Sequence, residues 1–209
     1  MLKRWTVLVI SGFALLVAAG CVPESNKSGG SEVIDPRQAA VRLEELPVGF
    51  VTREGLFTTG RQYRVRYQLA DKRTQADSGG ISGIDVEVTS QADLQGAKDA
   101  VTIFRDESAA ELLVENFIKE RNLTATNITV ETVEFPIDGA DEVVAYRAKW
   151  RDNTGYWAIY SLRFRATNMT AWVQAVTETN ADGDIVPEAK PTIRAISEVQ
   201  ARKLADAQK

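Results

Sequence analysis

Residues 143–177 read VVAYRAKWRDNTGYWAIYSLRFRATNMTAWVQAVT, and this stretch decides the fold. Apolar and polar residues alternate through three runs, which are residues 143–150, 156–166 and 170–177. A polar loop at 151–155 and a tight turn near Asn168 separate the runs. Alternation with a period of two is typical of half-buried strands, and such short connections join antiparallel neighbours. We therefore predict three consecutive antiparallel strands.

The pairing of these strands divides their side chains between two faces of the sheet. With Trp150 opposite Tyr156, one face is consistently apolar and is expected to face the core. Its members are Val144, Tyr146, Ala148, Ala158, Tyr160, Leu162, Ala171, Val173 and Ala175. The opposite face, here called the aromatic-basic face, consists of Arg147, Lys149, Trp157, Ile159, Arg163, Arg165, Trp172 and Val176. On it, Trp172 lies opposite Arg163 or Arg165, within reach of a cation–π contact.

The candidate binding residues of this chain are Trp157, Arg163, Arg165 and Trp172, all on the aromatic-basic face. A large exposed apolar patch is typical of a site for a partner or a ligand. The alternative is that a helix covers this face, so that the tryptophans belong to the core and the arginines extend past them to water. Sheets in α+β folds commonly bury one face under helices, which favours the alternative.

The rest of the chain completes an α+β domain with a mainly antiparallel sheet of about six or seven strands and two packed helices. Further strands are expected at residues 62–69, 84–88, 101–104 and 128–135. Helical segments are expected at residues 35–46 and 108–122 and from Pro191 onward. In the last of these, Ile193, Ile196, Val199 and Leu204 would face the core.

The composition limits the chemistry that is open to this chain. It has 25 basic and 29 acidic residues, a net charge of −4 at pH 7, and no histidine. A mildly acidic protein has no general attraction to nucleic acid, so we expect no nucleic-acid partner. Without histidine and with one cysteine, Ser-His-Asp sets, Cys-His sets and zinc sites are excluded, whereas carboxylate, lysine or tyrosine chemistry stays open. We expect no cofactor, no metal and no enzymatic activity.

The N-terminal residues 1–20 have the pattern of a secretory leader, with Lys3 and Arg4 followed by an apolar run and small residues. The apolar run is shorter than the roughly 20 residues that a membrane-spanning helix needs. The small residues end at Gly20, directly before Cys21, the only cysteine. This arrangement resembles the bacterial lipoprotein box. The resemblance implies diacylglycerol on the Cys21 sulfur, cleavage after Gly20 and a usually acylated new N-terminus, with palmitate as an expected chain. The alternative is an ordinary leader followed by a free Cys21 thiol.

Residues 21–32 would then be the lipidated cysteine and a flexible tether rich in serine and glycine, followed by one α+β domain at 33–209. The tether would span about 18 Å on average. We expect the protein to be held by its lipid on the extracytoplasmic side of the cell membrane or the outer membrane. If the host has two membranes, an aspartate after the lipidated cysteine would indicate retention at the inner one, so Val22 favours the outer membrane.

Residues 46–50 read LPVGF directly after an expected helix. A helix that runs into a Leu-Pro-x-Gly-aromatic step resembles a broad group of extracytoplasmic bacterial domains, which includes uncharacterised lipoproteins and outer sensor domains of membrane kinases. The resemblance implies no catalytic residues. Those sensor domains usually contain disulfides, and a chain with one cysteine cannot form one internally.

These observations favour a non-enzymatic domain that binds a small molecule or a protein partner at the cell envelope. One alternative is a carboxylate-based envelope hydrolase, for which the acidic turn with Asp138, Asp141 and Glu142 offers the acids. Another is a carrier that holds an apolar molecule between sheet and helix. A calcium loop at residues 180–184 is disfavoured, because its glycine is misplaced and no acid closes it.

Overall fold

The computed structural model describes residues 34–71, 73, 75, 77–120, 124–179 and 189–208, which belong to one compact unit, Val33–Lys209. The fold is α+β, as predicted, with a single antiparallel sheet of seven strands in the order β1-β2-β3-β7-β6-β5-β4. Three α-helices lie within the described residues, one more than the two predicted to pack on the sheet. The sheet joins two antiparallel sets of strands, β1 to β3 and β4 to β7, through the pairing of β3 with β7.

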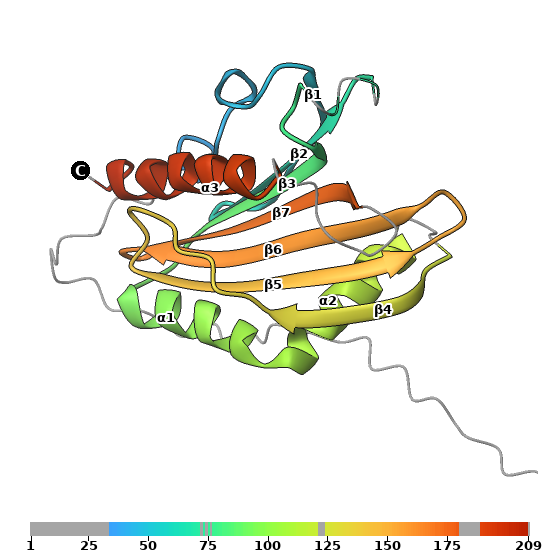
Figure 1. Ribbon diagram of the computed structural model, residues 1–209. Helices are drawn as coiled ribbons and strands as arrows, with labels where there is room; N and C mark the ends of the chain where they lie inside the picture. The colour runs from blue at the N-terminus through green and yellow to red at the C-terminus, as the bar shows by residue number, and fades with distance from the viewer. Residues whose placement is uncertain are drawn as a thin grey trace, which may run out of the picture. The chain divides into compact units, whose positions relative to one another are not determined.

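The strands are β1 Phe50–Thr59, β2 Gln62–Leu69, β3 Ile81–Ser90, β4 Thr126–Thr132, β5 Glu142–Arg151, β6 Tyr156–Ala166 and β7 Met169–Thr179. The helices are α1 Leu94–Thr102, α2 Glu107–Glu120 and α3 Ala189–Asp206, and 3-10 turns occur at Leu43–Glu45 and Ile103–Arg105. Helix α3 lies on one side of the sheet and α1 and α2 lie on the other, as Figure 1 shows. Helix α3 contacts β7, β6 and β3, α1 contacts β5, β6 and β7, and α2 contacts β4.

The main apolar core lies between α3 and the sheet. The strands supply the residues with the predicted alternation, and α3 supplies Ile193, Ile196 and Leu204, as predicted. The strand contributions include Val65, Tyr67, Ile84, Val86, Leu162, Phe164 and Val173. These side chains are almost completely buried, so this face of the sheet is the one that stabilises the fold through the hydrophobic effect.

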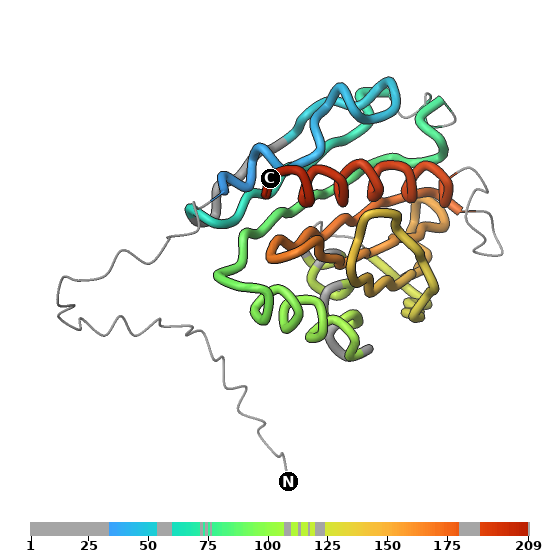
Figure 2. Tube along the Cα trace, turned by 90° about the vertical axis from the view of Figure 1, so that its left-hand side faces the viewer, coloured from blue at the N-terminus to red at the C-terminus, as the bar shows by residue number. Residues whose placement is uncertain are grey.

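The prediction of a helix at residues 35–46 was wrong. The segment forms turns and one 3-10 turn, because its backbone groups bond to side chains from elsewhere. Gln200 of α3 accepts a hydrogen bond from the Val41 amide at 2.8 Å and donates to the Ala39 carbonyl at 2.6 Å. The Tyr67 hydroxyl donates to the Val41 carbonyl at 2.8 Å. Figure 2 shows this N-terminal segment, in blue, passing the C-terminal end of α3.

The strand predicted at residues 101–104 is also wrong, since these residues end α1 and form the following 3-10 turn. Asp93 caps α1 by accepting a hydrogen bond from the Gly96 amide, and Ala97 and Val101, four residues apart, are its buried positions. Strand β1 was not predicted. Helix α2 confirms the prediction at 108–122 to within two residues, and β4 covers the first part of the strand predicted at 128–135.

The predicted pairing of the fifth and sixth strands is wrong by one residue. Trp150 lies opposite Trp157, not Tyr156, because Arg151 and Tyr156 form the last pair. The turn is therefore the four residues 152–155, which the Asp152 amide closes by donating to the Gly155 carbonyl at 3.0 Å. A shift of one residue exchanges the two faces of a strand. Consequently Val144, Tyr146 and Ala148 lie on the side of α1, whereas Arg147 and Lys149 lie on the side of α3.

Candidate functional site

The four candidate residues Trp157, Arg163, Arg165 and Trp172 lie on the same face of the sheet, as predicted. Arg163 is directly opposite Trp172, and its guanidinium carbon lies 5.9 Å from the centre of the indole ring. The structure thus brings Arg163 and Trp172 into contact, while Arg165 pairs across β7 with Thr170 and Trp157 pairs with Glu178.

Helices cover most of this face, which agrees with the alternative interpretation. Trp172 is buried, and only 13% of the Arg163 side chain is exposed. Phe104 belongs to the 3-10 turn after α1, and the centre of its ring lies 4.1 Å from the Arg163 guanidinium carbon. The aromatic-basic face is therefore an interior layer between sheet and helices over β6 and β7, and not a free docking surface.

Strand register defines three rows of facing residues on the α1 side of the sheet, and we call these rows the polar face. The first row holds Gln62, Thr89, Thr170, Arg165 and Glu142. The second holds Arg64, Glu87, Trp172, Arg163 and Val144, and the third holds Arg66, Asp85, Gln174, Ser161 and Tyr146. Seven of these residues are charged, whereas the α3 side of β2, β3, β6 and β7 is mostly apolar. An enclosed face of this polarity is unusual for a structural core.

A carboxylate–guanidinium cluster occupies the side of the polar face near β2. Asp85 is only 3% exposed and accepts hydrogen bonds from Arg66 Nε at 2.8 Å and Arg64 Nη2 at 3.3 Å. The Arg64 guanidinium carbon also lies 5.3 Å from the centre of the Trp172 ring. This cluster depends on the register between β2 and β3, which local sequence patterns do not give.

Arg163 differs from Arg64, Arg66 and Arg165, whose guanidinium groups donate hydrogen bonds to carboxylates. Its carboxylate partner, Glu87, lies 3.9 Å from Nη1, which is beyond hydrogen-bond distance. Its buried Nε has no hydrogen-bond partner among the residues that the structure describes. Burial lowers the pKa of the Arg163 guanidinium to about 10, and the charge of Glu87 only partly opposes this effect. The group is still cationic at neutral pH, so a nearly buried positive charge is poorly compensated.

The acidic turn that offered carboxylates for hydrolysis is instead tied to arginines. Arg165 donates to Asp141 Oδ2 at 2.9 Å and to Glu142 Oε2 at 3.1 Å, and Arg105 donates to Glu142 Oε1 at 2.7 Å. Burial raises the pKa of Glu142, but the hydrogen bonds from Arg105 and Arg165 outweigh this and hold it below its ordinary value. A general acid needs a raised pKa, so Glu142 does not fit that role.

The lowered pKa of Glu142 predicts that this group stabilises the fold only above the acid range. The unfolded chain lacks these hydrogen bonds and takes up the proton near pH 4.3, at a higher pH than the folded chain does. Stability from Glu142 is thus present above that pH and is lost as the pH falls through the lowered pKa. We expect Glu142→Gln to lower the melting temperature most near neutral pH, with a difference that shrinks below about pH 4. Melting curves of both proteins between about pH 3 and pH 7 test this prediction. A difference in melting temperature that does not change with pH would contradict it.

Trp157 lies at the far end of the face, at the turn between β5 and β6. Its indole nitrogen donates to Asp152 Oδ1 at 3.1 Å, and the same carboxylate accepts from the Thr154 amide at 2.7 Å. Burial raises the pKa of Asp152, but these hydrogen bonds hold it below its ordinary value. Trp157 also packs against the buried residues Trp150 and Ile159. These contacts explain the position of Trp157 through turn formation and packing.

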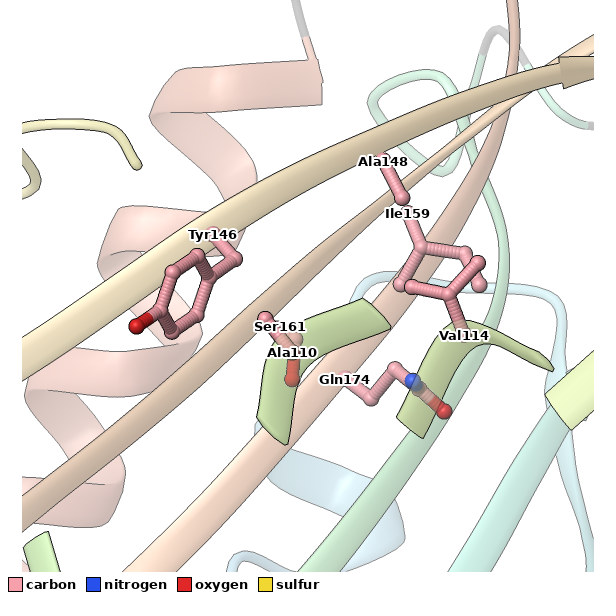
Figure 3. Close-up of a pocket in the computed structure, with 7 residues that line it drawn as sticks. All are labelled: Ala110, Val114, Tyr146, Ala148, Ile159, Ser161 and Gln174. Carbon is pink, nitrogen blue, oxygen red and sulfur yellow. The ribbon is translucent and has the colours of Figure 1, made fainter. Parts of the chain in front are cut away.

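A small cavity lies between α2 and the sheet (Figure 3). Its lining residues are Ala110, Val114, Tyr146, Ala148, Ile159, Ser161 and Gln174. Its volume of about 10 Å³ suits about one water molecule. Pockets for drug-sized ligands span roughly 300–1,000 Å³, so this cavity does not fit the prediction of an apolar cargo between sheet and helix.

A larger hollow of about 510 Å³ lies between the N-terminal segment and the end of α3. Its lining is mostly polar and consists of Gln38, Arg42, Lys203, Asp206 and Ala207. Lys203 donates to both carboxylate oxygens of Glu45 at 3.0 Å, so its charge is compensated. A polar hollow of this kind does not suit an apolar molecule either.

The calcium loop weighed at residues 180–184 lies outside the described residues. Within the described part of the chain, no group of three or more acidic, cysteine or histidine side chains is placed to hold a metal ion. A search of the same residues for a helix with the length and apolar character needed to cross a membrane finds none.

Comparisons with other proteins give a weak structural likeness that carries no argument about this chain. No protein-family model matches this sequence, and the comparison with curated proteins gives no match. Among solved structures, an uncharacterized protein from Mycobacterium smegmatis aligns with a TM-score of 0.36 and 12% identity, over 82% of this chain and 84% of that one. A likeness at this level carries no argument about function, so the functional proposal rests on the residues of this chain.

Proposed function

We propose that this chain is a lipid-anchored extracytoplasmic bacterial protein whose folded domain binds a small ligand or a protein partner and catalyses no reaction. The observation that carries the binding role is the polar face, where charged side chains lie buried or partly buried on the α1 side of the sheet. Burying charge is costly unless it is compensated, so such a face is a better site for recognition than for stability. The anchor rests on Cys21 and the leader pattern before it.

The binding role is tested by mass spectrometry of the purified full chain under native conditions. We expect a bound molecule or protein that co-purifies with the chain and is released when Arg163 or Arg64 is replaced. Variants at Arg73, an exposed residue outside the polar face, serve as the control and should retain it. A chain that carries nothing, together with unchanged behaviour of the variants, would count against the polar face as the site.

The anchor predicts that Cys21→Ala moves the protein from the detergent phase to the aqueous phase in a detergent partition experiment. Two acyl chains suffice for stable anchoring, at about 0.8 kcal/mol for each buried methylene, whereas a single chain binds only marginally. Ser25→Ala, four residues further along the tether, is the matched control and should stay in the detergent phase. A Cys21→Ala protein that remains wholly in the detergent phase would disprove lipid anchoring through this residue.

A further inference from the structure

We infer that Arg163 is an anion-binding residue, which takes a small oxyanion, a carboxylate or a phosphate group, on the part of the polar face over β6 and β7. The inference rests on the proposed binding function and names the class of ligand.

The buried Nε–H of Arg163 has no hydrogen-bond acceptor among the residues that the structure describes. A guanidinium has five N–H donors, and a buried polar group without a partner is costly. Glu87 is too distant to accept from Nη1, and the contacts with Phe104 and Trp172 are to aromatic rings. Aromatic rings hold the cation in place but supply no oxygen acceptor. The Nε–H donor is therefore available to an acceptor on a ligand.

The neighbouring carboxylates are hydrogen-bonded to other arginines. Asp85 binds Arg64 and Arg66, and Asp141 and Glu142 bind Arg165. The carboxylate paired with Arg163 is Glu87, which lies 3.9 Å from Nη1 and is not hydrogen-bonded to it. An oxyanion, which is opposite in charge to the guanidinium, supplies the acceptor oxygens that Glu87 does not. Carboxylate and phosphate oxygens also match the planar, forked donors of a guanidinium.

The polar face is more open on the side of β2. Exposure of the arginine side chains on the polar face rises from 13% at Arg163 to 27% at Arg64 and 30% at Arg66. Helix α1 makes its main sheet contacts with β5, β6 and β7, so the helix layer is centred away from β2. A small anion can therefore approach along the row that contains Arg64, Glu87 and Trp172.

Glu87 is the group that such an anion would meet. Its carboxylate repels an oxyanion at Arg163, yet Glu87 lies directly opposite Arg64 across the β2–β3 pair. Directly opposite residues have Cβ atoms about 4.5–5.5 Å apart, so Arg64 is within reach of the Glu87 carboxylate. We expect Glu87 to turn toward Arg64 when the anion binds, so that each guanidinium keeps one counter-ion.

The test is a titration of the full chain with acetate and with inorganic phosphate at constant ionic strength, with chloride as the balancing ion. Isothermal titration calorimetry measures the apparent Kd, and the NMR signal of the Arg163 Nε–H group reports the site. We expect saturable binding that Arg163→Met weakens by about tenfold or more, because a hydrogen bond to a charged group is lost. Glu87→Gln should tighten binding about threefold to tenfold, because a repelling charge is removed. Arg73→Met, at an exposed pair with Asp71, should leave the Kd unchanged.

Acetate and phosphate separate a carboxylate ligand from a phosphate ligand. A response of the same size in all variants would be a general salt effect on stability and would overturn the inference. Absence of binding to the unaltered chain would overturn it as well, while a co-purified uncharged ligand would leave the broader binding role intact. If Arg163→Met fails to fold, Glu87→Gln decides, since unchanged affinity in this nearly isosteric variant contradicts the proposed site.

Discussion

Replacing Gln200 by leucine is expected to lower the free energy of unfolding by about 3 kcal/mol. The Gln200 carboxamide is fully buried and bonds to the Val41 amide and the Ala39 carbonyl. Leucine has a similar volume, so no large cavity forms, but two buried backbone groups lose their partners. Each such group costs roughly 1–3 kcal/mol. Urea denaturation followed by circular dichroism measures the loss.

Gln208→Leu is the matched control for this substitution. Gln208 follows α3 and donates to the Ala166 carbonyl at 3.1 Å, but it is only partly buried. Water can replace a partner at a half-exposed position, so we expect a loss of about 0.5–1 kcal/mol. Equal losses in the two variants would show that Gln200 does not hold the N-terminal segment in the manner described.

Asp85→Asn is expected to lower the free energy of unfolding by about 2 kcal/mol. Removing one partner of a buried ion pair typically costs 3–5 kcal/mol, but Arg64 and Arg66 are partly exposed and can regain water. Asparagine keeps the shape of the side chain and one acceptor oxygen, so the loss reports mainly the missing charge. Denaturation in urea with an unchanged m value is the measurement.

Asp71→Asn tests whether burial of Asp85 is the cause. Asp71 also pairs with an arginine, Arg73, at 2.7 Å, but their side chains are 42% and 90% exposed. Exposed pairs of this kind contribute roughly 0–1 kcal/mol. We therefore expect a change of at most about 0.5 kcal/mol at Asp71, and a larger loss there than at Asp85 would contradict our account of the polar face.

Local patterns in the sequence predicted the strands and helices where alternation or helical spacing was regular. The strand predicted at residues 62–69 and the spacing of Ile193, Ile196 and Leu204 correctly identify parts of the main core. The prediction of a helix at 35–46 failed because the side chains of Gln200 and Tyr67, which are distant in sequence, bind the backbone of this segment. Local signals cannot include such partners.

The candidate site was predictable only in part, for a similar reason. The positions of Arg163 and Trp172 on one face follow from alternation within two adjacent strands. Glu87 lies opposite Trp172 only because β3 pairs with β7. Two helices and three strands separate β3 from β7 along the chain, so local patterns do not predict this pair. The error of one residue between β5 and β6 arose because the loop signal did not show that Arg151 continues the strand. Asp152, which closes the turn, became recognisable only from its hydrogen bonds.

The contact between Val41 and Gln200 also limits when this domain can finish folding. The two residues are 159 positions apart, and the central pair β3–β7 likewise joins early and late parts of the sequence. During synthesis the first three strands emerge long before α3 exists to cover their apolar side. The apolar side of these strands therefore stays uncovered, and exposed to chaperones or to aggregation, until α3 has been made.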